Sequence, residues 1–241
     1  MDAKDIAGRL EKNGIQAGPE TAEKLQIYLT LLREWNSRMD LTAVQDDEET
    51  VDRHFIDSLT VMKTDLISRG ESLIDVGTGA GFPGLVLAMA LPDLQVTLLD
   101  AQQKRLAFIR AVCEATGTAN AVPVHARAED GARKKELREQ FDIAAARAVA
   151  PADVLCEYLL PYVRVGGCAL CWKGPALKDE LAGGRRAAHL LGGRLEMPVS
   201  CPVDGREWEH LILPIRKVQP TPKQYPRKAG VPKQKPLGKT G

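Results

Sequence analysis

Residues 73–84 read Leu73-Ile74-Asp75-Val76-Gly77-Thr78-Gly79-Ala80-Gly81-Phe82-Pro83-Gly84, an apolar run that ends in an acid and is followed by four glycines within eight residues. A second apolar segment begins at Leu85. This order is typical of a strand, a tight turn and a helix, with glycine where the backbone turns sharply or lies close to a ligand. The stretch therefore predicts the ligand-binding turn of a βαβ unit.

A second acid, Asp100, lies 25 residues after Asp75, at the end of the apolar run 96–99. An acid at the tip of the neighbouring strand can accept hydrogen bonds from both hydroxyls of a ribose. The glycine-rich turn and Asp100 together predict a site for a nucleoside cofactor.

The position of Asp75 favours one cofactor over another. It precedes the first glycine by two residues, where it would repel a diphosphate but would suit the ammonium group of a methionine moiety, directly or through water. The chain has no Gly-x-x-x-x-Gly-Lys-Ser/Thr loop for nucleoside triphosphates. S-adenosylmethionine is the favoured cofactor, and NAD(P) or a purely structural turn are the alternatives.

After Gly70, short apolar runs alternate with helical stretches, which is the pattern of βαβ units in a parallel sheet. The predicted strands are 72–76, 95–99, 121–125, 142–146, 167–173, 195–200 and 209–215. The predicted helices are 83–91, 103–116, 131–139, 152–163 and 176–191. We expect an α/β fold, a doubly wound, mostly parallel seven-stranded sheet, with its ligand beyond the carboxyl ends of the strands.

Two amphipathic helices precede the first strand. Apolar residues recur at helical spacing in 20–39 and again in 46–66. The predicted organisation is an N-terminal helical cap (1–70), a domain that holds the predicted S-adenosylmethionine site (71–215) and a basic, proline-rich tail (216–241).

The composition narrows the class of protein. A chain of 241 residues with 44% hydrophobic residues can bury a sizeable core. It has no apolar run of the roughly 20 residues that a membrane span needs, and its polar start is unlike a signal peptide. Five scattered cysteines favour a reducing cytoplasm. Cys168 and Cys171 lie in an apolar strand, where their thiols would point to opposite faces, so we expect no metal site.

The small net charge of +1 hides an uneven distribution. Residues 216–241 hold eight Lys or Arg, five prolines and no acid, which leaves 25 basic against 32 acidic residues in the rest of the chain. Such a segment cannot form a core of its own, so it is expected either to be solvated or to lie on a polyanion. Contact with nucleic acid is favoured, because each Lys or Arg that meets a phosphate releases a counterion.

The cofactor loop 75–84 closely resembles that of the glucose-inhibited division protein B family, and the similarity extends over nearly the whole chain. The matching motifs are Trp35-Asn36, Leu41-Thr42, Arg53-His54-Phe55-Ile56-Asp57-Ser58, Leu99-Asp100, Lys104-Arg105 with Phe108, Arg127-Ala128-Glu129, Arg147-Ala148, Lys173-Gly174 and the tail segment 221–230. Two positions depart from the family pattern: Ala146 replaces a frequent serine, and Glu209-His210 replaces an Arg-His pair.

The resemblance implies a methyltransferase that places a methyl group on N7 of a guanine in small-subunit (16S) ribosomal RNA, in the decoding-region loop. The implied partner is 16S RNA or the 30S subunit. The resemblance implies no oligomer, so a monomer is expected, and the cofactor product would be S-adenosylhomocysteine. The expected location is the cytoplasm. The alternatives are a noncatalytic RNA-binding or ribosome-binding module with a relict cofactor fold, and a methyltransferase of another RNA, a protein or a small molecule.

The resemblance also implies the roles of individual residues. The expected cofactor-binding residues are Asp75, Gly77, Gly79, Gly81, Phe82, Asp100, Ala101, Gln102, Ala128, Glu129 and Arg147. The expected RNA-binding residues are Arg127, Lys173, Lys223, Arg227 and Lys228. Arg147 is the candidate for orienting the cofactor or the base, with a structural pairing to Asp142 as the alternative. For His54 and Asp57, three residues apart on one helix face, an interhelical hydrogen-bond pair is preferred to a catalytic role.

The catalytic motifs that the sequence lacks are consistent with this function. It has no Asn/Asp-Pro-Pro-Tyr motif for an exocyclic amine, and no Pro-Cys nucleophile for carbon-5 of a pyrimidine. Guanine N7 carries an in-plane lone pair and needs no deprotonation, so the protein has to supply alignment and electrostatics and no general base.

Overall fold

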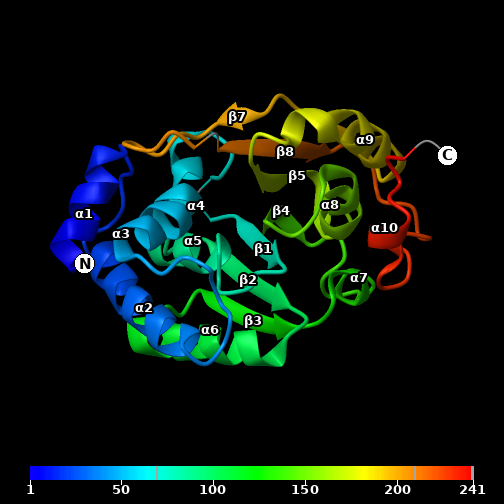
Figure 1. Cartoon of the computed structure of the whole chain (residues 1–241). Coiled ribbons are helices and arrows are strands. Elements are labelled where there is room, and N and C mark those ends of the chain that lie inside the picture. The colour runs from blue at the N-terminus through cyan, green and yellow to red at the C-terminus, as the bar shows by residue number, and fades with distance from the viewer. Residues whose placement is uncertain (69, 209, 240–241) are drawn as a thin grey trace.

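Figure 1 shows the computed structural model of the chain, which describes residues 1–68, 70–208 and 210–239. Its centre is one sheet with the strand order β3-β2-β1-β4-β5-β8-β6, and β7 pairs with β8. The strands are β1 (Ser72–Val76), β2 (Gln95–Asp100), β3 (Ala121–His125), β4 (Phe141–Arg147), β5 (Val163–Lys173), β6 (Gly193–Leu195), β7 (Val199–Ser200) and β8 (Leu211–Lys217).

The sheet is mixed, as its register shows. The strands β3, β2, β1, β4 and β5 are parallel, whereas β8 runs antiparallel to β5, β6 and β7. The chain leaves β1 toward β2 and later returns to β1's other side with β4, so the strand order reverses between β1 and β4. Ligands of such sheets bind at this reversal, beyond the carboxyl ends of the strands.

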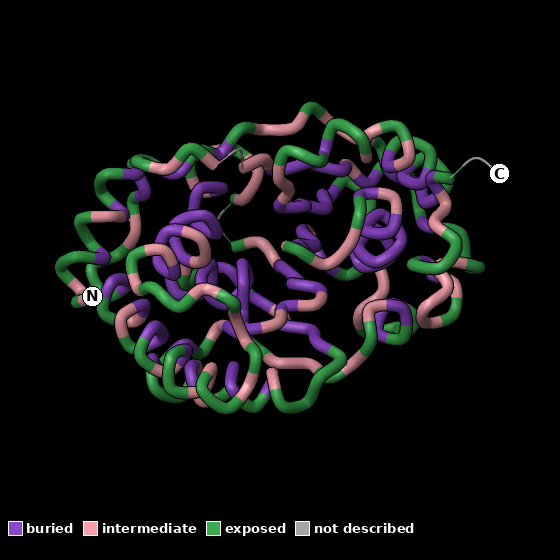
Figure 2. The backbone as a smooth tube through the Cα atoms, in the orientation of Figure 1, coloured by how far each residue is buried: buried purple, intermediate pink, exposed green. Residues whose placement is uncertain are grey.

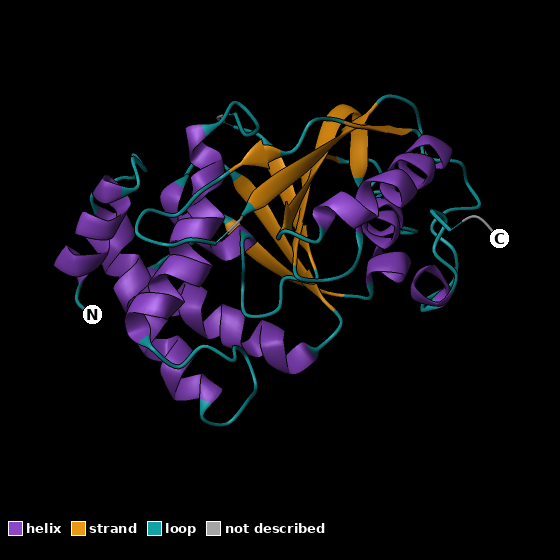
Figure 3. Ribbon diagram, turned by 45° about the horizontal axis from the view of Figure 1, so that its top comes forward, coloured by secondary structure: helices purple, strands orange, loops and turns teal. Residues whose placement is uncertain are grey.

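The helices cover both faces of the sheet (Figures 1 and 3). Between the strands lie α5 (Gly84–Ala90), α6 (Gln103–Thr116), α7 (Ala128–Gly131), α8 (Ala152–Leu159) and α9 (Leu177–Leu190). The N-terminal part holds α1 (Ala3–Lys12), α2 (Glu20–Asn36), α3 (Asp47–Thr50), the π-helix η1 (Val51–Ile56), α4 (Asp57–Leu59) and the 3₁₀-helix η2 (Thr60–Lys63). The last helix is α10 (Val231–Gln234).

Alternation along the strands produces two cores, because successive strand residues point to opposite faces. Leu73 and Leu98 belong to a core that also contains the apolar sides of α1, α2, η1, α5 and α6. Their neighbours Ile74 and Leu99 belong to a second core with α8 and α9. The purple segments of Figure 2 trace both cores beside the sheet. No helix in the described part of the chain is both long and apolar enough to span a membrane.

The two cysteines of β5 follow the same alternation. Cys168 lies in the first core and Cys171 in the second. The prediction that their thiols point to opposite faces is confirmed, and burial raises the pKa of the Cys168 thiol to about 11 and that of Cys171 to about 12. Both are buried, as expected from the apolar run around them.

The predicted α/β fold with a mostly parallel sheet is confirmed, and some predicted elements are wrong. The segment 195–200 forms two short strands, β6 and β7, so the sheet has eight strands. The predicted helix 131–139 is a series of turns after α7. The helix predicted at 152–163 ends at Leu159, because the chain enters β5 at Val163. Of the predicted strand 209–215, Glu209 lies outside the described residues and the strand continues to Lys217.

The predicted helix 46–66 is divided into four short pieces of different helical type. At Asp57 the backbone N–H donates to the carbonyl of Asp52, five residues back, where an α-helix would use Arg53. This π-type register leaves the Arg53 carbonyl available to another partner, and such single π turns frequently occur at functional sites.

Candidate functional site

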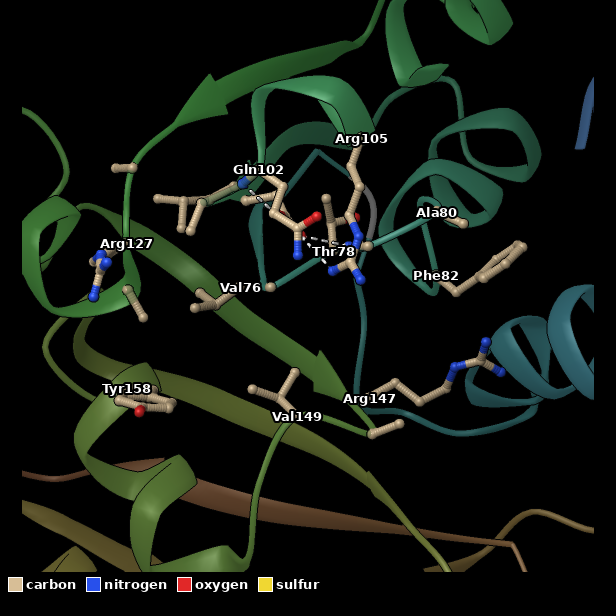
Figure 4. A pocket seen from close by; sticks show the side chains of 18 of the residues that line it. Val76, Thr78, Ala80, Phe82, Gln102, Arg105, Arg127, Arg147, Val149 and Tyr158 are labelled. Atoms are coloured by element: carbon tan, nitrogen blue, oxygen red, sulfur yellow. Dashed lines mark hydrogen bonds and ion pairs between the residues drawn. The ribbon is translucent and has the colours of Figure 1, made fainter. Parts of the chain in front are cut away.

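A cavity of about 800 Å³ opens where the strand order reverses. The loop after β1 forms its floor, with Gly77, Thr78, Gly79 and Ala80. The ends of β2, β3 and β4 supply its walls, and two residues of the tail, Gly230 and Lys233, close its far side. Figure 4 shows Phe82 and Arg147 at one end of this cavity and Arg127 and Tyr158 at the other.

Glycine is required in the floor for steric reasons. Gly77 has a φ of +76°, and a Cβ there would lie 3.1 Å from Cγ2 of Val149, across the cavity. Gly79 has a φ of +61°. Side chains at these positions would be strained and would fill the space that the loop leaves for a ligand.

Gly81 serves packing. A Cβ on it would come within 2.5 Å of the Tyr28 hydroxyl, and that hydroxyl also donates to the carbonyl of Ala80. Gly81 does not line the cavity. This glycine therefore lets the N-terminal helix α2 support the loop from behind.

Asp100 lies at the end of β2 and is 97% buried. Its Oδ2 accepts a hydrogen bond from Gly79 N at 2.9 Å, and its Oδ1 accepts from Gln102 N at 2.7 Å. Arg105 Nη1 lies 3.6 Å from Oδ2. Each carboxylate oxygen can accept more than one hydrogen bond, so Asp100 holds the loop in place and retains acceptor capacity toward the cavity, which it lines.

Asp75 lies beneath the loop and is fully buried outside the cavity lining. Its Oδ2 accepts from Thr78 Oγ1 at 2.6 Å and from Gly84 N at 2.9 Å, while Oδ1 has no partner among the described residues. Desolvation raises the pKa of this carboxyl to about 6, against the lowering effect of the two hydrogen bonds. The geometry gives Asp75 a role in fixing the loop, and a direct contact with the ammonium group of a cofactor is not supported.

Arg147, the last residue of β4, connects the sheet to the π-helix. Its Nη1 donates to the Arg53 carbonyl at 2.6 Å and to Asp57 Oδ2 at 2.9 Å, and its Nη2 lies 2.9 Å from His54 Nδ1. The guanidinium carbon also lies 5.1 Å from the centre of the Phe82 ring. The alternative pairing with Asp142 does not occur, because Asp142 binds Arg164 and Ser72.

His54 is a neutral imidazole in this network. Burial and the neighbouring Arg147 lower the pKa of His54 to about 3. A neutral ring accepts from Arg147 at Nδ1 and donates from Nε2 to Thr42 Oγ1, 2.7 Å away. His54 and Asp57 thus both bind Arg147 of β4, so their hydrogen bonds join the helical segment to a strand and not to another helix.

The basic tail packs on the body of the protein. Arg227 makes a two-pronged contact with Glu157, whose side chain is fully buried, at distances of 2.6–3.1 Å. The N–H of Gly230 donates to Glu129 Oε1 at 2.8 Å. Lys217 is also buried, where its ammonium group binds Glu139 and the Leu160 carbonyl. At these residues the tail therefore packs on the protein, where a solvated segment or one that lies on a polyanion was expected.

The structure brings most of the expected cofactor residues to one cavity. Its lining includes Gly77, Gly79, Phe82, Asp100, Ala101, Gln102, Ala128, Glu129 and Arg147, and excludes Asp75 and Gly81. The expected RNA-binding residues are scattered. Arg127 lies at the cavity mouth, Lys173 lies in a neighbouring cavity, Lys223 and Lys228 are exposed on the tail, and Arg227 is held by Glu157. A contact of Arg227 with RNA is not supported by this geometry.

Several lining residues were missed by sequence reasoning. Val149, Tyr158, Gly230 and Lys233 line the cavity although none of them follows the glycine motif or a predicted strand end directly. Gly230 carried a usable signal, since it lies in the tail segment that resembles the family. Nothing in the local sequence indicated Tyr158, because its position depends on how α8 packs.

Comparisons with known proteins agree with this geometry. The family model GidB, described as rRNA small subunit methyltransferase G, matches residues 21–208. A protein of Clostridium botulinum (strain Eklund 17B / Type B), "Ribosomal RNA small subunit methyltransferase G", is 46% identical over 93% of this chain and 94% of its own length. A protein of the same name from Alkaliphilus oremlandii is 43% identical over 98% of this chain and 100% of its own length.

Solved structures resemble the chain in fold alone. A predicted O-methyltransferase from Agrobacterium tumefaciens has a TM-score of 0.52 at 19% identity, over 70% of this chain and 81% of that protein. A TehB-like SAM-dependent methyltransferase from Corynebacterium glutamicum has a TM-score of 0.51 at 15% identity, over 79% of this chain and 97% of that protein.

Proposed function

This chain belongs to the GidB family, rRNA small subunit methyltransferase G, and from that premise we propose that it transfers a methyl group from S-adenosylmethionine to N7 of a guanine in 16S ribosomal RNA. The family makes the protein an S-adenosylmethionine-dependent methyltransferase of small-subunit rRNA. The proposal has four finer parts. They are methylation at the N7 atom, a target in the decoding-region loop, the 30S particle as a form in which the RNA is methylated, and a monomeric protein. A cytoplasmic location, which suits a ribosomal RNA substrate, is a further part of the proposal.

The residues of the large cavity fit this cofactor. A nucleoside needs a ribose acceptor, which Asp100 supplies, and a floor without side chains, which Gly77 and Gly79 supply. Ala101, Gln102 and Ala128 would hold the adenosine end, and Phe82 and Arg147 would hold the methionine end. When bound, S-adenosylmethionine supplies an electrophilic methyl group on a sulfonium.

The N7 assignment rests on the hydrogen bonds that the side chains around Arg147 already make. His54 is engaged by Arg147 and Thr42, and Asp57 is engaged by Arg147 and His210. None of these groups is left to remove a proton, which suits a target atom that has its lone pair ready. Held by Gly77, Gly79 and Asp100, the cofactor would supply its methyl group to the N7 lone pair and keep the electron pair of its C–S bond, so no proton would have to move.

The chain therefore contributes alignment and electrostatics. Arg147 fixes the reacting end of the cavity through its contacts with β4 and the π-helix, and the floor of the loop sets the path of the cofactor. The rival reading, a noncatalytic RNA-binding module, predicts no cofactor binding, so calorimetric titration with S-adenosylhomocysteine discriminates between the two.

Nucleoside analysis of 16S RNA tests the proposed function. Purified protein, S-adenosylmethionine and unmethylated 16S RNA or 30S subunits should yield 7-methylguanosine at one position, located by cleavage at that base. Asp100→Ala protein should yield less at equal concentration. Methylation at any atom other than guanine N7, or of no RNA at all, would refute the proposal.

A further inference from the structure

A second cavity, of about 360 Å³, adjoins the large one, and both are lined by His54, Arg147 and Ala148. We call it the β5 pocket, because its other walls come mainly from the end of β5 and from what packs there: Arg53, Asp57, Ala150, Trp172, Lys173, Gly174, Glu180 and His210. It lies on the side of Arg147 away from Asp100. A base in this pocket would therefore meet the cofactor at its reacting end.

A lysine and a glutamate pair within this pocket. Lys173 Nζ lies 2.5 Å from Glu180 Oε2 and 3.2 Å from the Ala150 carbonyl, and its side chain is 10% exposed. Glu180 Oε2 also accepts from Ala152 N at 2.7 Å. Two ammonium protons of Lys173 are thus in use. Glu180 Oε1 accepts no hydrogen bond from any residue that the structure describes.

The pair therefore offers one donor and one anionic acceptor side by side. The Watson–Crick edge of guanine presents the acceptor O6 beside the donors N1–H and N2–H₂. Adenine presents an N6 donor and an N1 acceptor, which would place donor against donor and acceptor against acceptor. A site whose polar groups pair with one pattern discriminates against the other, because the mismatched polar groups are left without partners.

We propose that Lys173 and Glu180 recognise the target guanine by its Watson–Crick edge, Lys173 donating to O6 and Glu180 Oε1 accepting from N1–H and N2–H₂. This inference rests on the proposed function. Binding by that edge leaves the adjacent Hoogsteen edge, with N7, free to face Arg147 and the cofactor cavity. The two residues are specificity-determining groups that touch the substrate.

The same contact favours the reaction. Methylation at N7 places a positive charge on the base, which makes N1–H and N2–H₂ stronger donors. Their hydrogen bonds to the Glu180 carboxylate are therefore stronger as the charge develops than in the ground state, and such a difference lowers the barrier.

Inosine supplies the test, because it keeps O6, N1–H and N7 and lacks only the N2 amine. We would place inosine at the methylated position of a ligated 16S RNA and compare kcat/KM with that of the guanine-containing RNA. The wild type should prefer guanine by about 10-fold to 100-fold, the size of a hydrogen bond to a charged group.

In Glu180→Gln this preference should fall to about 1. Lys173 and Ala152 N both donate to the Oε2 position, so the amide oxygen of the new glutamine stays there and its NH₂ group faces the base. Lys173→Met should lower kcat/KM on both RNAs to the same degree and leave their ratio unchanged, because both bases keep O6.

The controls separate recognition from folding. Glu20→Gln, in the exposed Lys24–Glu20 pair of α2, should leave both RNAs unaffected. S-adenosylhomocysteine affinity and melting temperature should be unchanged in Glu180→Gln. An equal guanine preference in wild type and Glu180→Gln would overturn the inference, as would a wild-type preference near 1, which needs no variant to fold. A wild type that methylates no guanine N7 would instead overturn the proposed function and this inference with it.

Discussion

Single residues in this site hold the loop and the reacting end in place as well as meeting ligands. Asp100 fixes Gly79 and Gln102, and Arg147 fixes the Arg53 carbonyl, His54 and Asp57. Substitutions at these positions therefore change both binding and local stability, and each test needs a readout for both.

Replacing Asp100 with alanine should weaken S-adenosylhomocysteine binding by about 1–3 kcal/mol, because the ribose hydroxyls lose a charged acceptor and Gly79 N loses its partner. Isothermal titration calorimetry measures the change. Asp93→Ala, on the exposed turn before β2, is the matched control and should bind as the wild type does. Equal affinities in Asp100→Ala and the control would remove Asp100 from the ribose site.

Replacing Arg147 with alanine should abolish methylation and also destabilise the free protein. Asp57, 4% exposed, would keep His210 as its one side-chain partner among the described residues, and breaking a buried ion pair costs about 3–5 kcal/mol. Urea unfolding without ligand and methylation assays measure the two effects. A variant with unaltered unfolding and no activity would show that Arg147 acts on the ligands alone.

The buried Asp75 carboxyl makes the stability of the folded protein depend on pH. Its pKa is about 6 in the folded protein and 3.8 in a model carboxyl, so it favours the folded state when protonated, and this contribution is lost as pH rises from about 4 through 6. The loss amounts to about 3 kcal/mol. His54, whose pKa is lowered to about 3, acts in the opposite direction, since its stabilising effect is lost as pH falls below about 6.5.

Asp75→Asn isolates the Asp75 contribution. Urea titration from pH 4 to pH 7.5 measures the unfolding free energy of wild type and Asp75→Asn. As pH rises from 4 to 6, the wild type should lose stability relative to the variant. The His54 effect cancels in this difference. A difference that stays constant with pH would mean that Asp75 is not held at a raised pKa.

The arrangement of the helices and strands determines which of these residues come into contact. The π-type register of residues 51–56 turns His54 and the Arg53 carbonyl toward β4, and a regular helix would leave Arg147 with fewer partners. The tail acts on the opposite wall, where Gly230 and Lys233 line the cofactor cavity. Its anchors, Arg227 on Glu157 and Gly230 on Glu129, are partly or fully buried.

Removing residues 218–241 should therefore destabilise the protein and weaken S-adenosylhomocysteine binding. Glu157, fully buried, would lose its only ion-pair partner among the described residues, and one wall of the cavity would be missing. A cut after Ile215 would in addition shorten β8, which continues to Lys217.

Thermal melting and calorimetry measure both effects of the truncation. A chain that ends at Gly238 is the control, since it retains Arg227, Gly230 and the carbonyl of Gly238 that Arg186 binds. If the protein without residues 218–241 has the same melting temperature and the same S-adenosylhomocysteine affinity as this control, the tail contacts contribute nothing to the site.

The whole molecule has a basic segment on an otherwise acidic body. Eight Lys or Arg follow residue 215, while the preceding residues hold 25 basic against 32 acidic side chains. Because Lys217 and Arg227 are committed to Glu139 and Glu157, the exposed lysines of the tail are the ones that can meet RNA phosphates.

The double variant Lys223→Gln, Lys228→Gln should bind 16S RNA with a flatter dependence of log affinity on log salt, by roughly 0.7–0.9 for each lost phosphate contact. Filter binding at several salt concentrations measures the slope. A charge-matched control with Lys4→Gln and Arg110→Gln, both exposed on other elements, should keep the wild-type slope. Equal slopes in all three proteins would place the RNA away from the tail.

The fold class and the cofactor loop were predictable from the sequence by itself, because strand alternation, helical spacing and the glycines of the turn are local patterns. Residues 77, 79, 82 and 100–102 follow strand ends directly, and parallel strands bring their carboxyl ends to one edge. The tail, the π-helix and the β5 pocket were decided only by the tertiary structure. Glu157 meets Arg227, and Arg147 meets Asp57, across 70 and 90 residues of chain. Such pairs form only when separate helices and strands pack together, so no local sequence pattern predicts them.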